Sequence, residues 1–377
     1  MTNRAFQRIR PRTSGFSLIE LMIAVLLGAL VVAGLINVLI ANRQAYHLQE
    51  ANSYNQQNMR FAMDRIGWSL RMAGFWGGVS GGGITGAPAV TPTGACNAAW
   101  ILDTANSVYG YDGNGGSADF PLSGCVADAN YIAGTDVLVV RYAGTDAVPT
   151  SGGTSGIIAG KVYLQAKTGV RGELFENTVP ADLPNSDEGV STYPYTIEMY
   201  YLRPCSDLGT AATCNAGSDG GNPIPTLMRL RLTDAGTLIN EPVVEGVEQL
   251  QFDYGIRAAP ADPAPAVYED AAAVTAAHAW ADVTAVRIGY VLRSQTRDTG
   301  MPHIFDSNST VATDATYPVR LSSDCQYGIN ATGSQKYAAD KCPNFSGTID
   351  AVSGNPQQFV RTQMTAVVQV RNSIRGP

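Results

Sequence analysis

The sequence predicts an α+β fold, in which a long N-terminal helix, first transmembrane and then amphipathic, packs on an antiparallel β-sheet head. Residues 16–41 are apolar almost without interruption, and about 20 such residues suffice for a membrane-spanning helix. The next segment contains no Pro or Gly before Gly67, so the helix is expected to continue. The remainder consists of short alternating runs between turn clusters. Such turns account for the 40 glycines and 20 prolines among 377 residues.

Charge is distributed unevenly along the chain. The formal net charge is −7, but residues 1–15 carry four arginines and no acidic residue. Removing these four from the 25 basic residues would leave 21 against 32 acidic residues, a net charge of −11. An acidic head argues against nucleic acid as a partner. A basic N-terminal tip fits retention of that end in the cytoplasm and export of the rest.

A carboxylate, Glu20, lies near the start of the apolar segment. An ionisable group within a membrane span is costly and suggests a function that requires a partner. No A-x-A-like cleavage site follows the apolar run, whereas Gly15 lies before it, at the junction with the basic leader. Cleavage there would leave the helix attached and create an α-amino group at Phe16. The alternative to cleavage is a signal anchor that stays uncleaved. The alternative to a partner charge is that the Glu20 side chain extends from the end of the helix to the lipid headgroups.

The order of basic leader, Gly15, Phe16, Ser-Leu-Ile-Glu20 and a further apolar run resembles the class III signal of type IV pilins and type II secretion pseudopilins. The resemblance implies that prepilin peptidase cuts between Gly15 and Phe16 and methylates the new N-terminus at Phe16. It also implies that Glu20 pairs with the N-terminal amine of a neighbouring subunit in a filament. Because desolvation opposes the attraction of buried charges, such a pair specifies register more than it adds stability.

After residue 41 the sequence becomes polar, and one apolar stripe recurs at spacings of three and four, as in an amphipathic helix. The stripe consists of Met59, Met63, Ile66, Leu70 and Ala73. Gly74, Gly77 and Gly78 predict the end of the helix. We therefore expect a cytoplasmic leader over residues 1–15, a transmembrane part over 16–41, a periplasmic part of the helix over 42–76 and a β-rich head over 77–377.

Seven runs of the head have the composition of strands, and several alternate between apolar and polar residues. They are residues 136–142, 161–166, 196–202, 226–232, 247–254, 282–293 and 363–371. The polar side chains Glu198 and Asp253 are expected to face solvent. Residues 259–275 and 296–358 are expected to be loops. Asp112, Asn114 and Asp119 resemble a calcium loop, but their spacing is not that of an EF-hand, and an Asn-Gly turn is favoured.

All six cysteines lie beyond the apolar segment, which suggests three disulfides in an exported chain. Fifteen connectivities are possible, and sequential pairing is preferred because each pair falls within one loop-rich region. The predicted pairs are Cys96–Cys125, Cys205–Cys214 and Cys325–Cys342. The chain has no C-x₂-C motif and only three isolated histidines, so no metal site and no cofactor are expected.

Four later segments resemble the PilW family of minor pilins, which is related to the J-type minor pseudopilins of type II secretion. They are residues 66–77, 244–255, 280–293 and 367–374. The resemblance implies a pilin-like fold and a role in priming type IV pilus assembly near the pilus tip, and hence in twitching motility and cell adhesion. It implies as partners the other minor pilins, the major pilin, prepilin peptidase and a tip adhesin. The protein would lie in a bacterial inner membrane, its head in the periplasm, before joining the fibre tip.

Two other classes of function are considered. A minor pseudopilin of a type II secretion system would carry the same N-terminal signal. A membrane-anchored enzyme would need a catalytic constellation, but the sequence lacks H-E-x-x-H and Walker motifs. An enzyme would also hold several buried ionisable groups in one pocket, whereas the head of a pilin would not.

Overall fold

The computed structural model describes residues 15, 17–90, 98–113, 125–132, 135–149, 156–184, 186–215, 217–221, 223–260, 262–295 and 361–372. The fold is α+β, as the sequence predicts. The chain divides into two compact units, Met1–Glu50 and Ala51–Pro377. The leader over residues 1–14, Phe16, three predicted disulfide cysteines (Cys96, Cys325 and Cys342), Asn114, Asp119 and the loop predicted over residues 296–358 lie outside the described residues.

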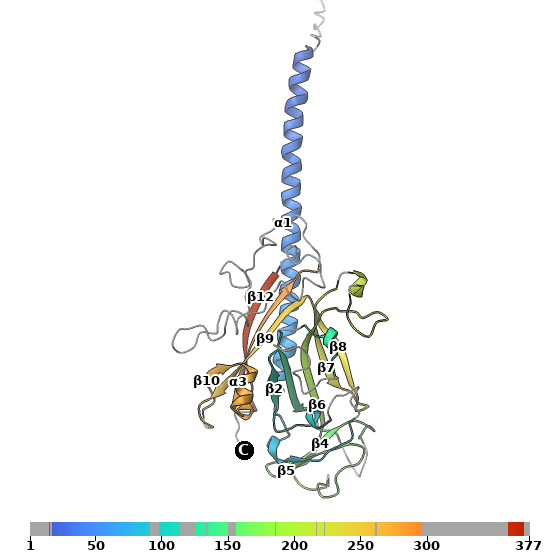
Figure 1. Ribbon diagram of the computed structural model, residues 1–377, viewed down its shortest axis with the longest axis vertical. Coiled ribbons are helices and arrows are strands. Elements are labelled where there is room, and N and C mark those ends of the chain that lie inside the picture. The colour runs from blue at the N-terminus through green and yellow to red at the C-terminus, as the bar shows by residue number, and fades with distance from the viewer. Residues whose placement is uncertain are drawn as a thin grey trace, which may run out of the picture. The chain divides into compact units, whose positions relative to one another are not determined.

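The first helix, α1, runs from Leu18 to Met72 (Figure 1). It starts two residues after the predicted Phe16, because Ser17 occupies the capping position ahead of the first turn. It ends where Gly74 adopts a left-handed backbone with φ of 72°, a conformation that favours glycine. The predicted stop is therefore confirmed at its first glycine.

The other helices are short. They are α2 (Ala98–Ile101), α3 (Ala271–Ala276) and the 3₁₀ turns η1 (Gly81–Gly83), η3 (Asp128–Asn130), η4 (Ser218–Gly221) and η5 (Trp280–Asp282).

Within the described residues, the strands of the head form two sheets. The eight strands of the first sheet are β1 (Ile84–Thr85), β2 (Val108–Tyr111), β3 (Val137–Ala143), β4 (Tyr163–Lys167), β5 (Arg171–Phe175), β6 (Val190–Arg203), β7 (Thr226–Leu232) and β8 (Leu238–Glu245). The four strands of the second sheet are β9 (Val247–Arg257), β10 (Pro265–Glu269), β11 (Val283–Arg293) and β12 (Arg361–Gln369).

The first sheet is organised around β6, its longest strand. Residues 190–194 of β6 pair with β4, residues 195–200 with β3 and residues 198–203 with β7. These pairings are antiparallel, whereas β1 pairs with β5 in parallel. The head is thus mainly but not purely antiparallel.

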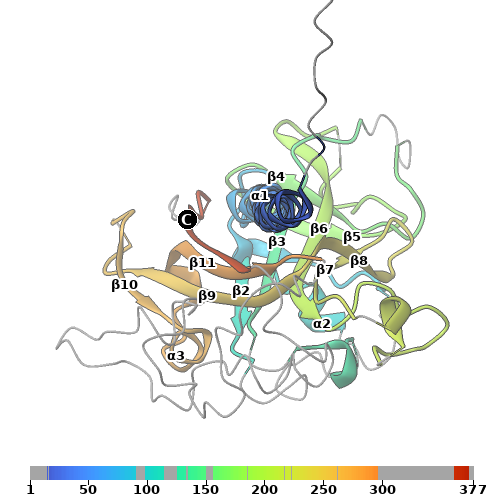
Figure 2. The ribbon, with the colours of Figure 1, turned by 90° about the horizontal axis from the view of Figure 1, so that it is seen from above.

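The second sheet has the order β10-β9-β11-β12, all antiparallel, and Figure 2 shows β9, β11 and β12 side by side. A single residue, Gly246, links β8 of the first sheet to β9 of the second. Its φ is 86°, and a Cβ at this position would lie 2.6 Å from the carbonyl oxygen of Arg293. Only glycine fits this junction without strain.

The predicted apolar stripe of α1 packs into the core shared by the two sheets. Met59, Ile66, Leu70 and Ala73 are buried, and Met63 packs against the same core. Alternation along β3 divides its side chains between two cores. Leu138, Val140 and Tyr142 join the helix in the first core, while Val137, Val139 and Ala143 enter a second core on the other face, as the period of two in a strand requires.

Two features of the head differ from the sequence-based expectation. Glu198 and Asp253 are not solvated but almost completely buried, because each lies in a central strand covered on both faces and is held by an ion pair, with Arg65 and Arg287 respectively. Residues 259–275 are not simply a loop, since they contain β10 and most of α3. The seven predicted strands are present as β3, β4, β6, β7, β9, β11 and β12, whereas β1, β2, β5, β8 and β10 were not predicted.

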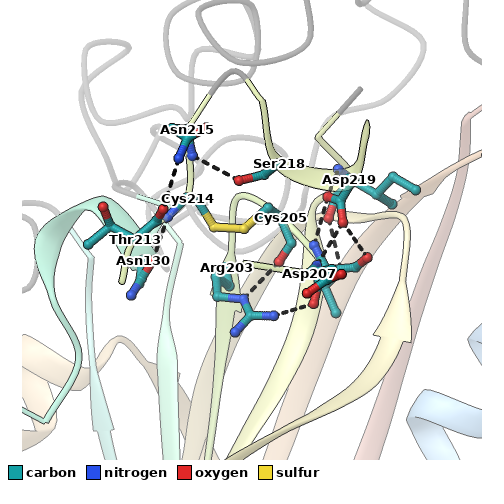
Figure 3. The surroundings of a disulfide bond; sticks show 12 residues. Asn130, Arg203, Cys205, Asp207, Thr213, Cys214, Asn215, Ser218 and Asp219 are labelled. Atoms are coloured by element: carbon teal, nitrogen blue, oxygen red, sulfur yellow. Dashed lines mark hydrogen bonds between the residues drawn. A yellow bond between two sulfur atoms is a disulfide. The ribbon is translucent and has the colours of Figure 1, made fainter. Parts of the chain in front are cut away.

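A disulfide joins Cys205 and Cys214, one of the three predicted pairs. Figure 3 shows Asp219 beside this loop, where its carboxylate accepts hydrogen bonds from the Ser206 hydroxyl and from the backbone N–H of Ser206, Asp207 and Ile224. Partial burial raises the pKa of Asp219, but these hydrogen bonds outweigh it and lower the pKa below its usual value. Cys125 is disulfide-bonded as well.

We expect the double variant Cys205→Ser/Cys214→Ser to lower the free energy of unfolding by about 2–3 kcal/mol, because the bridge closes a short loop in the unfolded chain. Denaturant unfolding of the full-length protein in detergent measures this change. Thr210→Ala, at an exposed position of the same loop, is the control and should be near neutral. Equal midpoints for the double variant and the wild type would contradict the prediction.

Two carboxylates lie at the start of α3. Asp270 caps the helix by accepting from the Ala273 N–H at 2.7 Å, and Asp112 accepts from the N–H groups of Ala271 and Ala272. Burial, and then the negative charge of Asp270, raise the pKa of Asp112 to about 6. Asp112 therefore belongs to the α3 cap.

This raised pKa makes the stability of the head depend on pH. Between about pH 4 and pH 6 the folded state binds the Asp112 proton more tightly than the unfolded state does, so the contribution of this group to stability falls as pH rises. Asp112→Asn cannot ionise and should gain stability relative to the wild type across that window. Thermal unfolding of both proteins from pH 4 to pH 7 measures the difference, and parallel profiles would refute it.

Candidate functional site

The N-terminal end of α1 is closed by a capping box. The Ser17 hydroxyl accepts from the Ile19 N–H at 3.2 Å, and a carboxylate oxygen of Glu20 accepts from the Ser17 N–H at 3.0 Å. Ser-x-x-Glu is the usual sequence of this motif, and it is present at positions 17–20. Glu20 thus has an intrachain hydrogen-bond donor at the helix start.

This capping box lies directly after the predicted cleavage site. Gly15 is exposed and non-helical, and the first helical residue is Leu18. The bond expected to be cut therefore precedes the helix rather than lying inside it. A backbone outside a helix is the form in which a chain can enter a peptidase site.

The first half of α1 exposes its apolar side chains on all sides. Large apolar residues from Leu18 to Ile40 are exposed, and none of the most apolar 18-residue window is buried. By length and composition, α1 can cross a membrane. Such a surface requires lipid or other apolar helices around it.

A network of buried charges attaches the second half of α1 to the head. Glu198 of β6 accepts from Arg65 of α1 at 2.7 Å and from Arg229 of β7 at 2.8 Å. Its other oxygen accepts from the Ser69 hydroxyl of α1 and from the Tyr200 hydroxyl. The Glu198 side chain is only 3% exposed, so its charge is balanced by residues of the chain itself.

The network continues outward to the edge of the first sheet. Arg229 also bonds Glu241 of β8 at 2.5 Å, and Glu241 in turn accepts from Arg231. Burial, reinforced by the negative charge of Glu198, raises the pKa of Tyr142 and of Tyr200 well above the usual value. Both phenols therefore stay neutral and act as hydrogen-bonding groups. Several ionisable groups therefore lie together here. The carboxylates of Glu198 and Glu241 are paired with arginines of the same network, which fits a structural role.

The C-terminal end of the chain also holds α1. The Asn372 side-chain amide donates towards the carbonyl oxygens of Arg71, Met72 and Ala73, the nearest at 3.0 Å. These are terminal carbonyls, which lack partners within the helix. The Tyr290 hydroxyl of β11 donates to the Met59 carbonyl oxygen at 2.5 Å. Because these contacts join residues about 230 or 300 positions apart, no local sequence pattern predicted them.

The predicted site residues fall into separate groups. Gly15 and Glu20 lie at the helix start, whereas Cys205 and Cys214 lie in the segment between β6 and β7, where Cys205 is buried. Among the described residues, no group of three or more His, Cys, Asp or Glu side chains is placed to hold a metal ion.

Comparison with known families gives two matches. The family described as type IV pilus-assembly protein W (PilW) matches residues 213–372, which run from the disulfide loop through β12 to Asn372. The prokaryotic N-terminal methylation motif matches residues 10–36, which include Gly15, Phe16 and Glu20. Curated proteins and solved structures yield no match.

Glu198→Ala should destabilise the full-length protein by about 3–5 kcal/mol, because it leaves the cations of Arg65 and Arg229 beside a cavity that lacks a counter-charge. Denaturant unfolding in detergent measures the loss. The matched control is Asp234→Ala, which removes the exposed partner of Lys161 and should cost less than about 1 kcal/mol. If both variants unfold at the same midpoint, Glu198 does not fix α1 to the head.

Proposed function

The chain belongs to the PilW family of type IV pilus minor pilins, and from this premise we propose that it helps to prime pilus assembly and remains near the pilus tip. The observation that carries the proposal is the presence of both family matches on one chain, the methylation motif at residues 10–36 and the PilW segment at 213–372. The methylation motif supports insertion into the membrane and then into the filament. The PilW segment distinguishes this chain from pilins in general.

Processing would begin at the helix start. Prepilin peptidase removes residues 1–15, and the new N-terminus at Phe16 is methylated. Residues 16–41 then anchor the protein in the inner membrane, residues 42–76 continue the helix into the periplasm, and residues 77–377 form the head. The exposed apolar surface of the first half of α1 supports this division, because a filament of packed helices supplies the apolar surroundings that the membrane supplied before.

Glu20 would exchange partners during assembly. In the described structure its carboxylate accepts from the Ser17 N–H, a bond that reduces the cost of placing it in an apolar environment. Cleavage creates an α-amino group at Phe16, and the corresponding amine of a neighbouring subunit would pair with Glu20 in the filament. A charged partner in a low-dielectric bundle attracts the carboxylate more strongly than a backbone amide does.

The head would contact the other minor pilins, the major pilin and a tip adhesin. Its disulfides suit a periplasmic location, because disulfides persist in oxidising compartments. The matched family is described as a pilus-assembly protein, and we propose that the chain is a substrate of prepilin peptidase and has no enzymatic activity itself. A role in twitching motility and adhesion follows from the place at the pilus tip.

The test compares Glu20→Ala with Glu20→Gln in cells that lack the wild-type protein. Both variants should still be processed to methylated Phe16, as mass spectrometry of the mature protein reports, and both should fail to restore surface pili. Glutamine keeps an acceptor for the Ser17 N–H but cannot pair with an amine as a charge. If Glu20→Gln fails to restore pili, the negative charge of Glu20 is required in addition to its hydrogen bond in the helix cap. The control is Glu50→Gln on the same helix, which should restore pili.

Three results would overturn parts of the proposal. A mature N-terminus other than methylated Phe16 removes the processing step. Full piliation with Glu20→Gln removes the charge pairing. Intact pili in cells without the protein, combined with loss of enzyme secretion, would assign the chain to a type II secretion system instead.

A further inference from the structure

A small group of polar side chains lies directly after the apolar segment of α1. Arg43, Tyr46 and His47 are all exposed, Tyr46 by 67%. The rings of Tyr46 and His47 make an edge contact, with centroids 6.5 Å apart and planes at 72° to each other. Residues three and four positions apart are neighbours on the surface of a helix, so the three side chains share one side of α1. We call Arg43, Tyr46 and His47 the boundary cluster.

The length of the uncharged segment determines where the boundary cluster falls in a membrane. Residues 21–42, between Glu20 and Arg43, contain no charged side chain. At 1.5 Å per residue, Arg43 lies about 34.5 Å along the axis from Glu20, and His47 about 40.5 Å. The hydrocarbon core of a bilayer is about 30 Å thick, and the bilayer with its headgroups about 40–45 Å. With Glu20 among the cytoplasmic headgroups, the boundary cluster therefore lies among the headgroups of the periplasmic leaflet.

The donors of the boundary cluster suit the phosphate of a phospholipid. A guanidinium donates two parallel hydrogen bonds to a phosphate, and the tyrosine hydroxyl and an imidazole N–H supply further donors. Side chains of a helix lean towards its N-terminus, which here is the direction of the membrane. The positions one turn before and after Arg43 hold Leu39, Ile40, Tyr46 and His47. None of these is acidic, so no neighbour on the helix competes for the guanidinium.

A lipid phosphate is favoured over a free phosphate as the occupant. The boundary cluster continues directly from a fully exposed apolar surface that can cross a membrane. Tyrosine and long basic side chains are suited to the headgroup level, because each combines an apolar body with a polar end. Three exposed donors on one helix do not enclose a soluble anion, whereas a bilayer holds its phosphates at a fixed height beside the helix.

Removal of the leader changes which cations can hold the helix in the membrane. Residues 16–42 contain no basic side chain, so after the proposed cleavage Arg43 is the first basic residue of the mature chain. The leader that is removed carries four arginines, Arg4, Arg8, Arg10 and Arg12. Basic residues that flank a span are normally in excess on its cytoplasmic side. In the mature protein, the basic side chain nearest to the span would instead be periplasmic.

We propose that Arg43, Tyr46 and His47 bind the phosphate of a phospholipid headgroup in the periplasmic leaflet and thereby set the depth of the processed helix. Before cleavage, the leader arginines hold the cytoplasmic end of the helix. After cleavage, the boundary cluster is the main attachment, on the side towards which the subunit leaves the membrane. The lipid site requires only that α1 spans a membrane, whereas this exchange of anchors rests on the function proposed above.

The test measures the depth of α1 with a spin label on Leu39→Cys in the mature protein, residues 16–377, in vesicles of phosphatidylethanolamine and phosphatidylglycerol. Accessibility of the label to oxygen and to a water-soluble nickel complex reports its depth. Protein without the added cysteine corrects for labelling elsewhere. In the triple variant Arg43→Gln/Tyr46→Phe/His47→Gln, the label should move towards the bilayer centre by at least about 3 Å, just over half a helical turn. The reason is that the charged N-terminal end then draws the helix towards the cytoplasmic side without opposition.

Controls for the residue and for the lipid make the result specific. Arg60→Gln, on the same helix about 60 Å from Glu20, should leave the label at the wild-type depth. In vesicles of digalactosyldiacylglycerol, which has no phosphate, the wild-type label should lie as deep as that of the triple variant, and added inorganic phosphate should not restore it. The proposal is wrong if the triple variant keeps the wild-type depth, if Arg60→Gln shifts the label equally, if the glycolipid has no effect, or if inorganic phosphate restores the depth.

The uncleaved precursor, residues 1–377, separates this inference from the proposed function. Its leader arginines should hold the helix, so the triple variant should move the label by less than half as far as in the mature protein. Equal movement would overturn the exchange of anchors. With all four leader arginines changed to glutamine, the full movement should return, and its absence would overturn the lipid site. This last comparison requires no cleavage, so it remains decisive even if the mature N-terminus is not Phe16 and the proposed processing step fails.

Discussion

The apolar stripe of α1 between Met59 and Ala73 is the surface on which both sheets of the head close. Side chains from β3, β6 and β7 of the first sheet and from β9, β11 and β12 of the second lie in one core with this stripe. Neither sheet could bury its inner face to the same extent without the helix. The packing therefore couples the position of the helix to the integrity of the head.

Buried polar contacts then select one position of the helix among those that an apolar stripe would allow. Apolar packing alone tolerates small shifts along or around the axis, whereas the contacts of Arg65 and Ser69 with Glu198 do not. Burying Glu198 carries a desolvation cost, and its two arginine partners offset that cost only with correct geometry. The Glu198 carboxylate thus specifies the register of the helix against the head through its partners.

The two faces of the second half of α1 have different surroundings. The inner face is satisfied within the chain, as the contacts of Asn372, Tyr290 and Glu198 show. The outer face carries Phe61 and Trp68 in contact with solvent. The first half of the same helix also exposes large apolar side chains. The distribution of side chains around the axis of α1 thus leaves apolar surface exposed in both halves of the helix.

Local patterns in the sequence were enough to predict several features of this protein. The apolar run after Gly15, the position of Glu20, the stripe from Met59 to Ala73 and the stop at Gly74 each depend on residues within a few helical turns, and the longer strands followed from alternation. Three features became evident from the three-dimensional structure alone. The strands form two sheets joined at Gly246, Glu198 and Asp253 are buried, and Asn372 caps a helix that ends 300 positions earlier in the chain. A polar residue on a strand has the same sequence pattern whether water or another layer covers it. What covers it is set by contacts between distant segments, and these depend on the whole fold.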